Sequence, residues 1–338
     1  MKKLAYFTFL AVLFECIVSC AQSRFESVIS KYNDGSLELD SVLSYITDSL
    51  NYDDVNKWSQ ENLSNDINAR YIRAYYLEEG ILQDKNIPLA ITLYKADELE
   101  NKDGHFAYAL ARAYNKENKS DSMVYWLEKA VVKQYKHAYG LLARLNSSGF
   151  ADLNGNILIK PNVAKAVELA EIGISKGDDS SKESLALIYY SGSLGDQKKQ
   201  ESFTMLSSIP NDKLSSEGLF VLSLMYGNGD GVVMNLEKSF EYCLKSAEKG
   251  NPEAMNNLGV AYHMGIGIEK NDTLAFKWYN KAANSGNSMA MSNVGHCYHN
   301  GIGVSQNAYV AIEWYKRSAK QGESAAIEYL NSVHIPYE

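Results

Sequence analysis

The chain is poor in proline and cysteine, with five and four of them among 338 residues, and it has no low-complexity tract and no long block of like charge. Few prolines are typical of a mostly helical chain, because proline breaks helices. Acidic residues outnumber basic ones, which gives a formal net charge of −8. Proteins that bind nucleic acid through its phosphates need clustered Lys and Arg. The composition therefore argues against nucleic acid as a partner.

Long hydrophobic runs are scarce too, and the one present lies at the N-terminus. It covers residues 4–18, follows two lysines, and is too short for a comfortable bilayer span. It ends in Ile-Val-Ser directly before Cys20, which resembles the lipobox of bacterial lipoproteins. The resemblance implies a signal peptide over residues 1–19 and acyl chains on Cys20 that anchor the protein to a membrane. An ordinary secretory signal cleaved nearby, or an uncleaved anchor, remains the alternative.

A lipoprotein signal also implies a location. The acylated protein would belong to the cell envelope, on a bacterial membrane, with the outer membrane favoured. Because no second hydrophobic run follows, the rest of the chain is expected to be soluble, in the periplasm or at the surface.

What the chain does contain is a repeat of fixed length. Residues 250–322 hold two near-copies of one sequence, offset by 36 residues. The matched positions are Ala254 and Ala290, Leu258 and Val294, Gly259 and Gly295, Tyr262 and Tyr298, Gly265 and Gly301, Gly267 and Gly303, Ala275 and Ala311, Trp278-Tyr279 and Trp314-Tyr315, and Gly286 and Gly322. A fixed period in this range indicates stacked supersecondary units.

Weaker copies of the unit precede these two, from about residue 68. One has a connection between its helices that is four residues shorter, and the next has seven residues inserted within residues 150–162. A further unit has a weak second helix that ends before Pro210, and the unit up to Gly250 is regular. After Gly322 the first helix of another unit begins and the sequence stops, as expected for a C-terminal cap.

The pattern within a unit predicts two antiparallel helices. In residues 254–264 the small or apolar positions form one stripe of a helix. A helix-interior glycine such as Gly259 costs about 0.5–1 kcal/mol relative to Ala, which is tolerable where a neighbouring helix must approach closely. Gly265 supplies the positive φ of a C-cap, and Asp272 or Thr273 can cap the second helix. Such pairs, stacked with a constant small rotation, give an all-α, right-handed α-solenoid.

The motif Ala-x-x-x-Leu-Gly-x-x-Tyr-x-x-Gly-x-Gly, followed by Ala-x-x-Trp-Tyr-x-x-Ala-Ala-x-x-Gly, resembles the Sel1-like repeat, a relative of the tetratricopeptide repeat. The resemblance implies a scaffold that binds other proteins, often in signalling or envelope assemblies, and is not catalytic. It divides the chain after the signal peptide into a tether with N-terminal capping helices (20–67) and a solenoid (68–338). The solenoid has degenerate repeats over 68–213, regular repeats over 214–322 and a C-terminal cap over 323–338.

In such stacks the first helix of each unit lines the inner, concave face. The register also puts Val260, His263 and His296 on that face, but Tyr and Arg dominate interface hot spots. We therefore expect an unidentified protein partner to contact Tyr71, Tyr75, Tyr108, Arg112, Arg144, Tyr190 and Phe220. On this interpretation, replacing Arg112 and Arg144 with Ala leaves melting nearly unchanged and weakens partner capture. The alternative is that some of the tyrosines pack within the degenerate stack.

Two other functions are weighed against protein binding. Tyrosines and Phe220 could stack on sugars, so binding of peptidoglycan or another glycan is the alternative, although no recognised carbohydrate motif is present. His296 and His299 lie three residues apart, with His263 one repeat before His299, but a zinc site needs a third ligand. Recurrence with the repeat favours surface histidines, and we expect no metal, no cofactor and no catalytic residue. The least favoured reading is a hydrolase akin to the cysteine-rich Sel1-like proteins linked to β-lactam binding, whose paired cysteines this chain lacks.

Two cysteines remain besides Cys20 once the signal peptide is removed. Cys243 and Cys297 fall on helices that two further helices separate, and each helix layer is about 8–10 Å thick. A disulfide needs Cα atoms within roughly 7 Å. We therefore expect both thiols to be unpaired and mostly buried.

Overall fold

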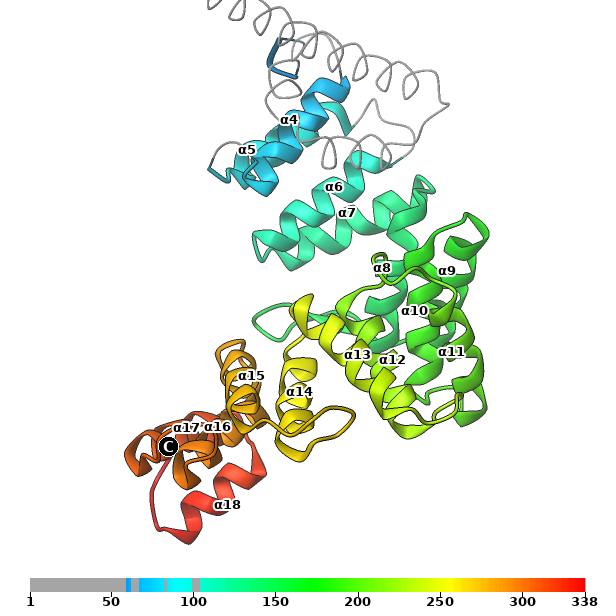
Figure 1. Cartoon of the computed structure of the whole chain (residues 1–338). Helices are drawn as coiled ribbons and strands as arrows, with labels where there is room; N and C mark the ends of the chain where they lie inside the picture. Colours follow the sequence, from blue (N-terminus) through cyan, green and yellow to red (C-terminus); the bar gives the residue numbers. More distant parts are fainter. Residues whose placement is uncertain (1–58, 62–66, 82–83, 99–103, 338) are drawn as a thin grey trace, which may run out of the picture. The chain divides into compact units, whose positions relative to one another are not determined.

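The computed structural model describes residues 59–61, 67–81, 84–98 and 104–337 (Figure 1). The predicted signal peptide, the predicted lipidation site Cys20 and nearly all of the expected tether and capping helices lie outside the described residues. Two compact units are present. One comprises the described residues up to Ala138 together with 151–158, and the other comprises 139–150 and the residues from Ile159 onward.

The first unit is built from helices that pack in chain order. Its helices are α4 (Ile67–Glu79), α5 (Ile87–Glu98), α6 (His105–Lys116) and α7 (Ser120–Val132). Each of α5, α6 and α7 packs on the helix before it. The short connection between α6 and α7 accounts for the shortened unit expected from the sequence.

The second unit is also built from helix pairs. It contains most of α8 (Lys136–Ser148), then α9 (Val163–Ser175), α10 (Asp179–Tyr190), the 3-10 helix η1 (Asp196–Lys198), α11 (Lys199–Ser207), α12 (Ser216–Asn228), α13 (Leu236–Glu248), α14 (Pro252–Met264), α15 (Asp272–Asn284), α16 (Ser288–Asn300), α17 (Ala308–Ala319) and α18 (Ser324–Ser332). From α10 to α18 each α-helix packs on the previous one. The predicted architecture of stacked helix pairs is confirmed.

A two-stranded sheet departs from the all-α prediction. Strands β1 (Phe150–Ala151) and β2 (Ile157–Ile159) pair with each other within residues 150–162, where the sequence indicates a seven-residue insertion. The Asp152 carboxylate accepts hydrogen bonds from the backbone N–H of Asn154 (2.9 Å) and Asn156 (2.8 Å). Asp and Asn favour such turns because their side chains accept hydrogen bonds from nearby backbone N–H groups, and Gly favours them because it adopts positive φ. The inserted residues therefore form a hairpin rather than a longer loop.

The helix caps correct one expectation. The second helix of the repeat begins at Asp272, and its N-cap is Asn271, whose side chain accepts from the N–H of Leu274 at 2.9 Å. Asp272 and Thr273 therefore lie inside the helix and do not cap it. The equivalent asparagines one repeat on either side, Asn235 and Asn307, cap α13 and α17 in the same way.

The repeat glycines end the first helix of a unit and let the second helix pack closely against it. Gly265 is the C-cap of α14 and has the positive φ (72°) that the sequence predicts. A Cβ at Gly259 would collide with the ring of Tyr279, and one at Gly295 would lie 3.1 Å from the ring of Tyr315. The expected close approach of the neighbouring helix is therefore confirmed, and a buried tyrosine makes it.

The thiols of Cys243 and Cys297 are unpaired and buried, as predicted. Burial raises the pKa of each thiol to about 12. Within the residues that the structure covers, no helix is long and apolar enough to cross a membrane.

Candidate functional site

The expected partner-binding residue Tyr71 belongs to the core of the first unit. Its side chain is only 3% exposed. The ring lies 5.3 Å from the ring of Tyr94 and 5.1 Å from that of Phe106, measured between centroids. This corrects the register-based expectation, because a buried ring cannot contact a partner without unfolding its surroundings.

Arg112 is engaged in a buried ion pair. Its Nη2 lies 2.7 Å from Oε2 of Glu78, whose side chain is fully buried. Lys116 pairs with the other oxygen of Glu78 at 3.0 Å, and the hydroxyl of Tyr94 donates to the same carboxylate at 3.0 Å. Burial alone would raise the pKa of Glu78, but Arg112 and Lys116 outweigh it and hold the pKa below the ordinary value of 4.5. Arg112 thus neutralises a core carboxylate.

Tyr75 and Tyr108 are half-buried neighbours of this core. The guanidinium carbon of Arg112 lies 5.5 Å from the ring centroid of Tyr75, a cation–π contact. The ring of Tyr108 packs against Tyr135 with centroids 5.4 Å apart. Both tyrosines keep part of their surface exposed, so they remain candidate contacts for a partner.

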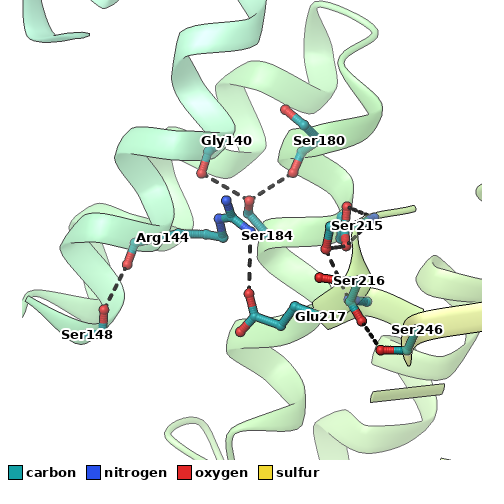
Figure 2. Close-up of polar contacts among 11 residues, drawn as sticks. Gly140, Arg144, Ser148, Ser180, Ser184, Ser215, Ser216, Glu217 and Ser246 are labelled. Atoms are coloured by element: carbon teal, nitrogen blue, oxygen red, sulfur yellow. Dashed lines mark hydrogen bonds and ion pairs between the residues drawn. The ribbon is translucent and has the colours of Figure 1, made fainter. Parts of the chain in front are cut away.

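Arg144 lies on α8 in the second unit and has a side chain 40% exposed. Figure 2 shows it reaching toward α12, where its Nη1 lies 3.3 Å from Oε2 of Glu217. Beneath it, Ser184 donates to the carbonyls of Gly140 (3.0 Å) and Ser180 (2.8 Å). The exposed ion pair is weak compared with the hydrogen bonds below it, because solvent screens exposed charges.

Glu183 is the buried acid of this region. Its carboxylate accepts from the backbone N–H of Ser215 at 3.1 Å and from the Ser215 hydroxyl, so it stabilises the N-terminus of α12. Burial raises the pKa of Glu183, and the hydrogen bonds from Ser215 only partly offset that.

Tyr190 and Phe220 are the remaining predicted contacts, and both are half-buried. Tyr190 packs beside the apolar cluster of α10 to α12, with the Lys199 ammonium 6.0 Å from its ring centroid. Phe220 packs on the edge of the cluster formed by α13 to α16. Each presents one side to a core and one to solvent.

A pocket opens beside the regular repeats, between α14, α15 and α16. Its volume is about 260 Å³. The lining residues are Val260, His263, Met264, Tyr279, Asn293, His296, Cys297 and Ile302. Register placed Val260, His263 and His296 on the inner face but did not indicate a pocket. Register did not place the other five lining residues there; among them is Asn293, whose amide donates to Oδ1 of Asn256 at 2.8 Å.

The three histidines near this pocket have separate partners, and that of His296 is the Asn300 amide, 3.1 Å from its Nδ1. Nδ1 of His263 lies 2.6 Å from Oδ1 of Asp272, and Nδ1 of His299 lies 3.1 Å from the hydroxyl of Tyr329. Burial, and secondarily the charges of the other two imidazoles, lowers the pKa of His296. Among the residues that the structure describes, no three metal-ligating side chains gather in a group that could hold an ion.

These features define a helical-repeat protein built from packed helix pairs. Residues 67–96, 149–178, 216–251, 252–287 and 288–323 match the Sel1 repeat. The chain is therefore a Sel1 repeat protein with five matched repeats. No curated protein matches it.

Solved structures share the fold. A Sel1 repeat protein from Oxalobacter formigenes is 18% identical, with a TM-score of 0.56, over 95% of this chain and 91% of that one. A protective antigen of uropathogenic Escherichia coli that displays an SLR fold is 22% identical, with a TM-score of 0.53, over 84% of this chain. The match spans 61% of the length of that antigen.

Proposed function

We propose that this chain is a non-catalytic scaffold of the bacterial cell envelope that binds another protein through its repeats. In this proposal, acyl chains on Cys20 hold it to a membrane, with the outer membrane favoured, and the repeats stand in the periplasm or at the surface. The five Sel1 repeats support the scaffold role, since such repeats generally mediate protein interactions. The lipobox-like sequence before Cys20 supports the anchor.

The observation that carries the proposal is a first-helix face that recurs on α12, α14 and α16. We define it by Leu224, Val260, His263, Asn293 and His296. Leu224, Val260 and His296 occupy one register position, 36 residues apart, and stay half-buried or exposed. The residues two positions before them, which are Leu222, Leu258 and Val294, are buried.

The chemistry of the first-helix face suits a protein partner. Its members include no Lys, Arg, Asp or Glu, and the centres of protein interfaces are depleted in charge. Phe220 lies on α12 one turn before Leu224 and adds an aromatic side chain at one end. The pocket lined by Val260, His263 and Asn293 adds a recess that a partner can enter.

Site-specific photocrosslinking in native cells tests the proposed function. The photoreactive amino acid p-benzoylphenylalanine replaces Val260, and adducts are identified by mass spectrometry. The matched control carries it at Lys277, which is exposed on the second helix α15. We expect one protein adduct at Val260 and none at Lys277. No adduct at Val260, or the same adducts at both positions, contradicts the proposal.

The glycan alternative is tested separately with purified sacculi. If the wild-type protein co-sediments with sacculi and Val260→Arg does not, the first-helix face binds an envelope polymer, and the protein-binding proposal is wrong. We expect no co-sedimentation that depends on Val260.

The anchor is tested by metabolic labelling with an alkyne analogue of palmitate. We expect label on the wild-type chain and none on Cys20→Ser. Cys16→Ser is the matched control, because Cys16 lies within the predicted signal peptide and should not change labelling. Equal labelling of the wild type and Cys20→Ser contradicts the anchor.

A further inference from the structure

The pocket beside Tyr279 has an occupied counterpart one repeat later. Adding 36 residues converts His263, Tyr279 and Asn293 into His299, Tyr315 and Tyr329. At that later position the ring of Tyr329 stacks on the ring of Tyr315, with centroids 4.2 Å apart and an interplanar angle of 29°. The hydroxyl of Tyr329 lies 3.1 Å from Nδ1 of His299. The molecule thus fills its own later site with a phenol side chain.

In the earlier repeat Asn293 stands where Tyr329 stands in the later one. Its short side chain turns to Asn256, to which the amide donates at 2.8 Å, and it brings no ring to Tyr279. Tyr279 and Asn293 here both line the pocket of about 260 Å³. One difference between the two sites is therefore the presence or absence of an aromatic side chain over the buried tyrosine.

The pocket has the size and the walls for such a ring. Its volume lies below the range of about 300–1,000 Å³ for sites that take drug-sized molecules, so it suits one side chain. Val260, Met264 and Ile302 supply apolar walls, and Tyr279 supplies an aromatic one. Tyrosine side chains combine an apolar body with one polar tip and prefer stacked or edge-on ring contacts.

Polar groups at the same pocket can meet the phenol hydroxyl. Asp272 already holds Nδ1 of His263, at 2.6 Å. The equivalent of Asp272 in the next repeat is Ala308, so Nδ1 of His299 is left for Tyr329. In the pocket, Nδ1 of His263 is already taken. The hydroxyl of an incoming ring would therefore form its hydrogen bonds with Asn293 or with the remaining imidazole nitrogens of His263 and His296.

We propose that this pocket receives a tyrosine side chain of the partner protein, with its ring against Tyr279, as Tyr329 lies against Tyr315. This inference rests on the proposed function, because it names the feature of the partner that the first-helix face recognises. It predicts that the bound segment of the partner carries a tyrosine whose ring is buried on binding.

The test uses N-acetyl-tyrosinamide as a probe of the mature protein, with N-acetyl-leucinamide for comparison, followed by NMR and calorimetry. We expect saturable binding at one site, shifts of the Tyr279 ring signals, and affinity at least about threefold weaker for the leucine probe, which lacks ring stacking. No saturation up to the solubility limit of the tyrosine probe, or saturation without shifts at Tyr279, overturns the inference. These measurements on the unaltered protein do not depend on any variant folding.

Asn293→Tyr is the decisive variant, since it places in the pocket the residue that the next repeat has. We expect its own ring to stack on Tyr279 and to weaken binding of the tyrosine probe by at least about tenfold. The matched control is Asn284→Tyr, at an exposed position on α15, which should bind as the wild type does. Equal binding to Asn293→Tyr and the wild type overturns the inference.

The crosslinking experiment separates this inference from the proposed function. If Val260 captures a protein but the wild type does not bind the tyrosine probe, the tyrosine pocket is wrong and the scaffold role stands. If the tyrosine probe binds and Asn293→Tyr blocks it, but Val260 captures no protein, the pocket stands and the scaffold role is wrong.

Discussion

Arg112 on α6 donates to the fully buried carboxylate of Glu78 on α4, with Nη2 2.7 Å from Oε2. Removing the guanidinium strands a buried charge that keeps only Lys116 and the Tyr94 hydroxyl. A hydrogen bond to a charged group contributes about 1.5–3 kcal/mol, so we expect Arg112→Ala to lower the free energy of unfolding by about that amount. Urea denaturation followed by circular dichroism measures it. This replaces the register-based expectation that melting stays unchanged.

Arg144→Ala is the matched control for Arg112→Ala. Its ion pair with Glu217 joins side chains 40% and 57% exposed, and such surface pairs contribute about 0–1 kcal/mol. We expect little change in stability. If Arg112→Ala and Arg144→Ala cost the same, the buried pair is not a stabilising feature of the first unit.

The same carboxylate predicts a loss of stability in acid. The folded-state pKa of Glu78 lies below 4.5, so its contribution is present above that value and is lost as the pH falls through the folded pKa. Glu78→Gln removes this dependence. We expect the difference in unfolding free energy between the wild type and Glu78→Gln to shrink as the pH is lowered below about 4.5. A difference that does not vary with pH would contradict the charge network.

Glu183 should show the opposite sign. Burial raises its folded-state pKa above 4.5, so its ionisation becomes a cost to the folded state as the pH rises from that value through the folded pKa. We expect Glu183→Gln to become more stable relative to the wild type between acidic and neutral pH, because the amide keeps an acceptor for Ser215. Parallel pH profiles of the wild type and Glu183→Gln would contradict the prediction.

The two helix glycines should differ in their tolerance of alanine. At Gly259 a Cβ collides with the ring of Tyr279, whereas at Gly295 it lies 3.1 Å from the ring of Tyr315. Overpacking costs about 1–3 kcal/mol, while Ala gains about 1 kcal/mol of helix propensity over Gly. We expect Gly259→Ala to destabilise the protein and Gly295→Ala to be near neutral, as thermal denaturation would report. If Gly259→Ala loses no more stability than Gly295→Ala, the Tyr279 ring moves aside freely.

Sequence periodicity was sufficient for the regular repeats because small residues and the Trp-Tyr pair recur at a fixed offset. It predicted the C-cap at Gly265 and the close packing at Gly259, which depend on backbone conformation and local spacing. It offered Asp272 or Thr273 as the cap, because both residue types commonly cap helices, but the helix already begins at Asp272. Asn271, directly before that start, caps the helix.

The same periodicity did not predict which side chains are exposed in the degenerate repeats. A register position faces outward only where its neighbours follow the regular pattern, and at Tyr71 the rings of Tyr94 and Phe106 pack against the predicted contact residue. The burial of Glu78 depends on Arg112, 34 residues away, and no local pattern indicates such a pair. The pocket depends on the absence of a ring at Asn293. The sequence does not reveal this, because it does not show that the equivalent Tyr329 stacks on Tyr315.

A serine on the second helix ties consecutive helices together in alternate repeats. The Ser246 hydroxyl donates to the carbonyl of Ser216 at 2.6 Å (Figure 2), and Ser318 donates to the carbonyl of Ser288 at 2.8 Å. The repeat between them has Ala282 at this position. All three side chains are fully buried. The middle repeat thus lacks a hydrogen bond that its neighbours have.

This arrangement predicts that removing the serine hydroxyl and adding one have opposite effects on stability. A buried hydrogen bond contributes about 0.5–1.5 kcal/mol net, so we expect Ser318→Ala to lower the free energy of unfolding by that amount. Ala282→Ser should be tolerated or slightly stabilising, because the carbonyl of Pro252 lies at the position equivalent to Ser216 and Ser288 and can accept. Urea denaturation measures both variants, and hydrogen exchange at the start of α14 reports whether the new bond forms. A large loss in Ala282→Ser would mean that the hydroxyl is buried without a partner and that the repeats differ in backbone spacing at this position.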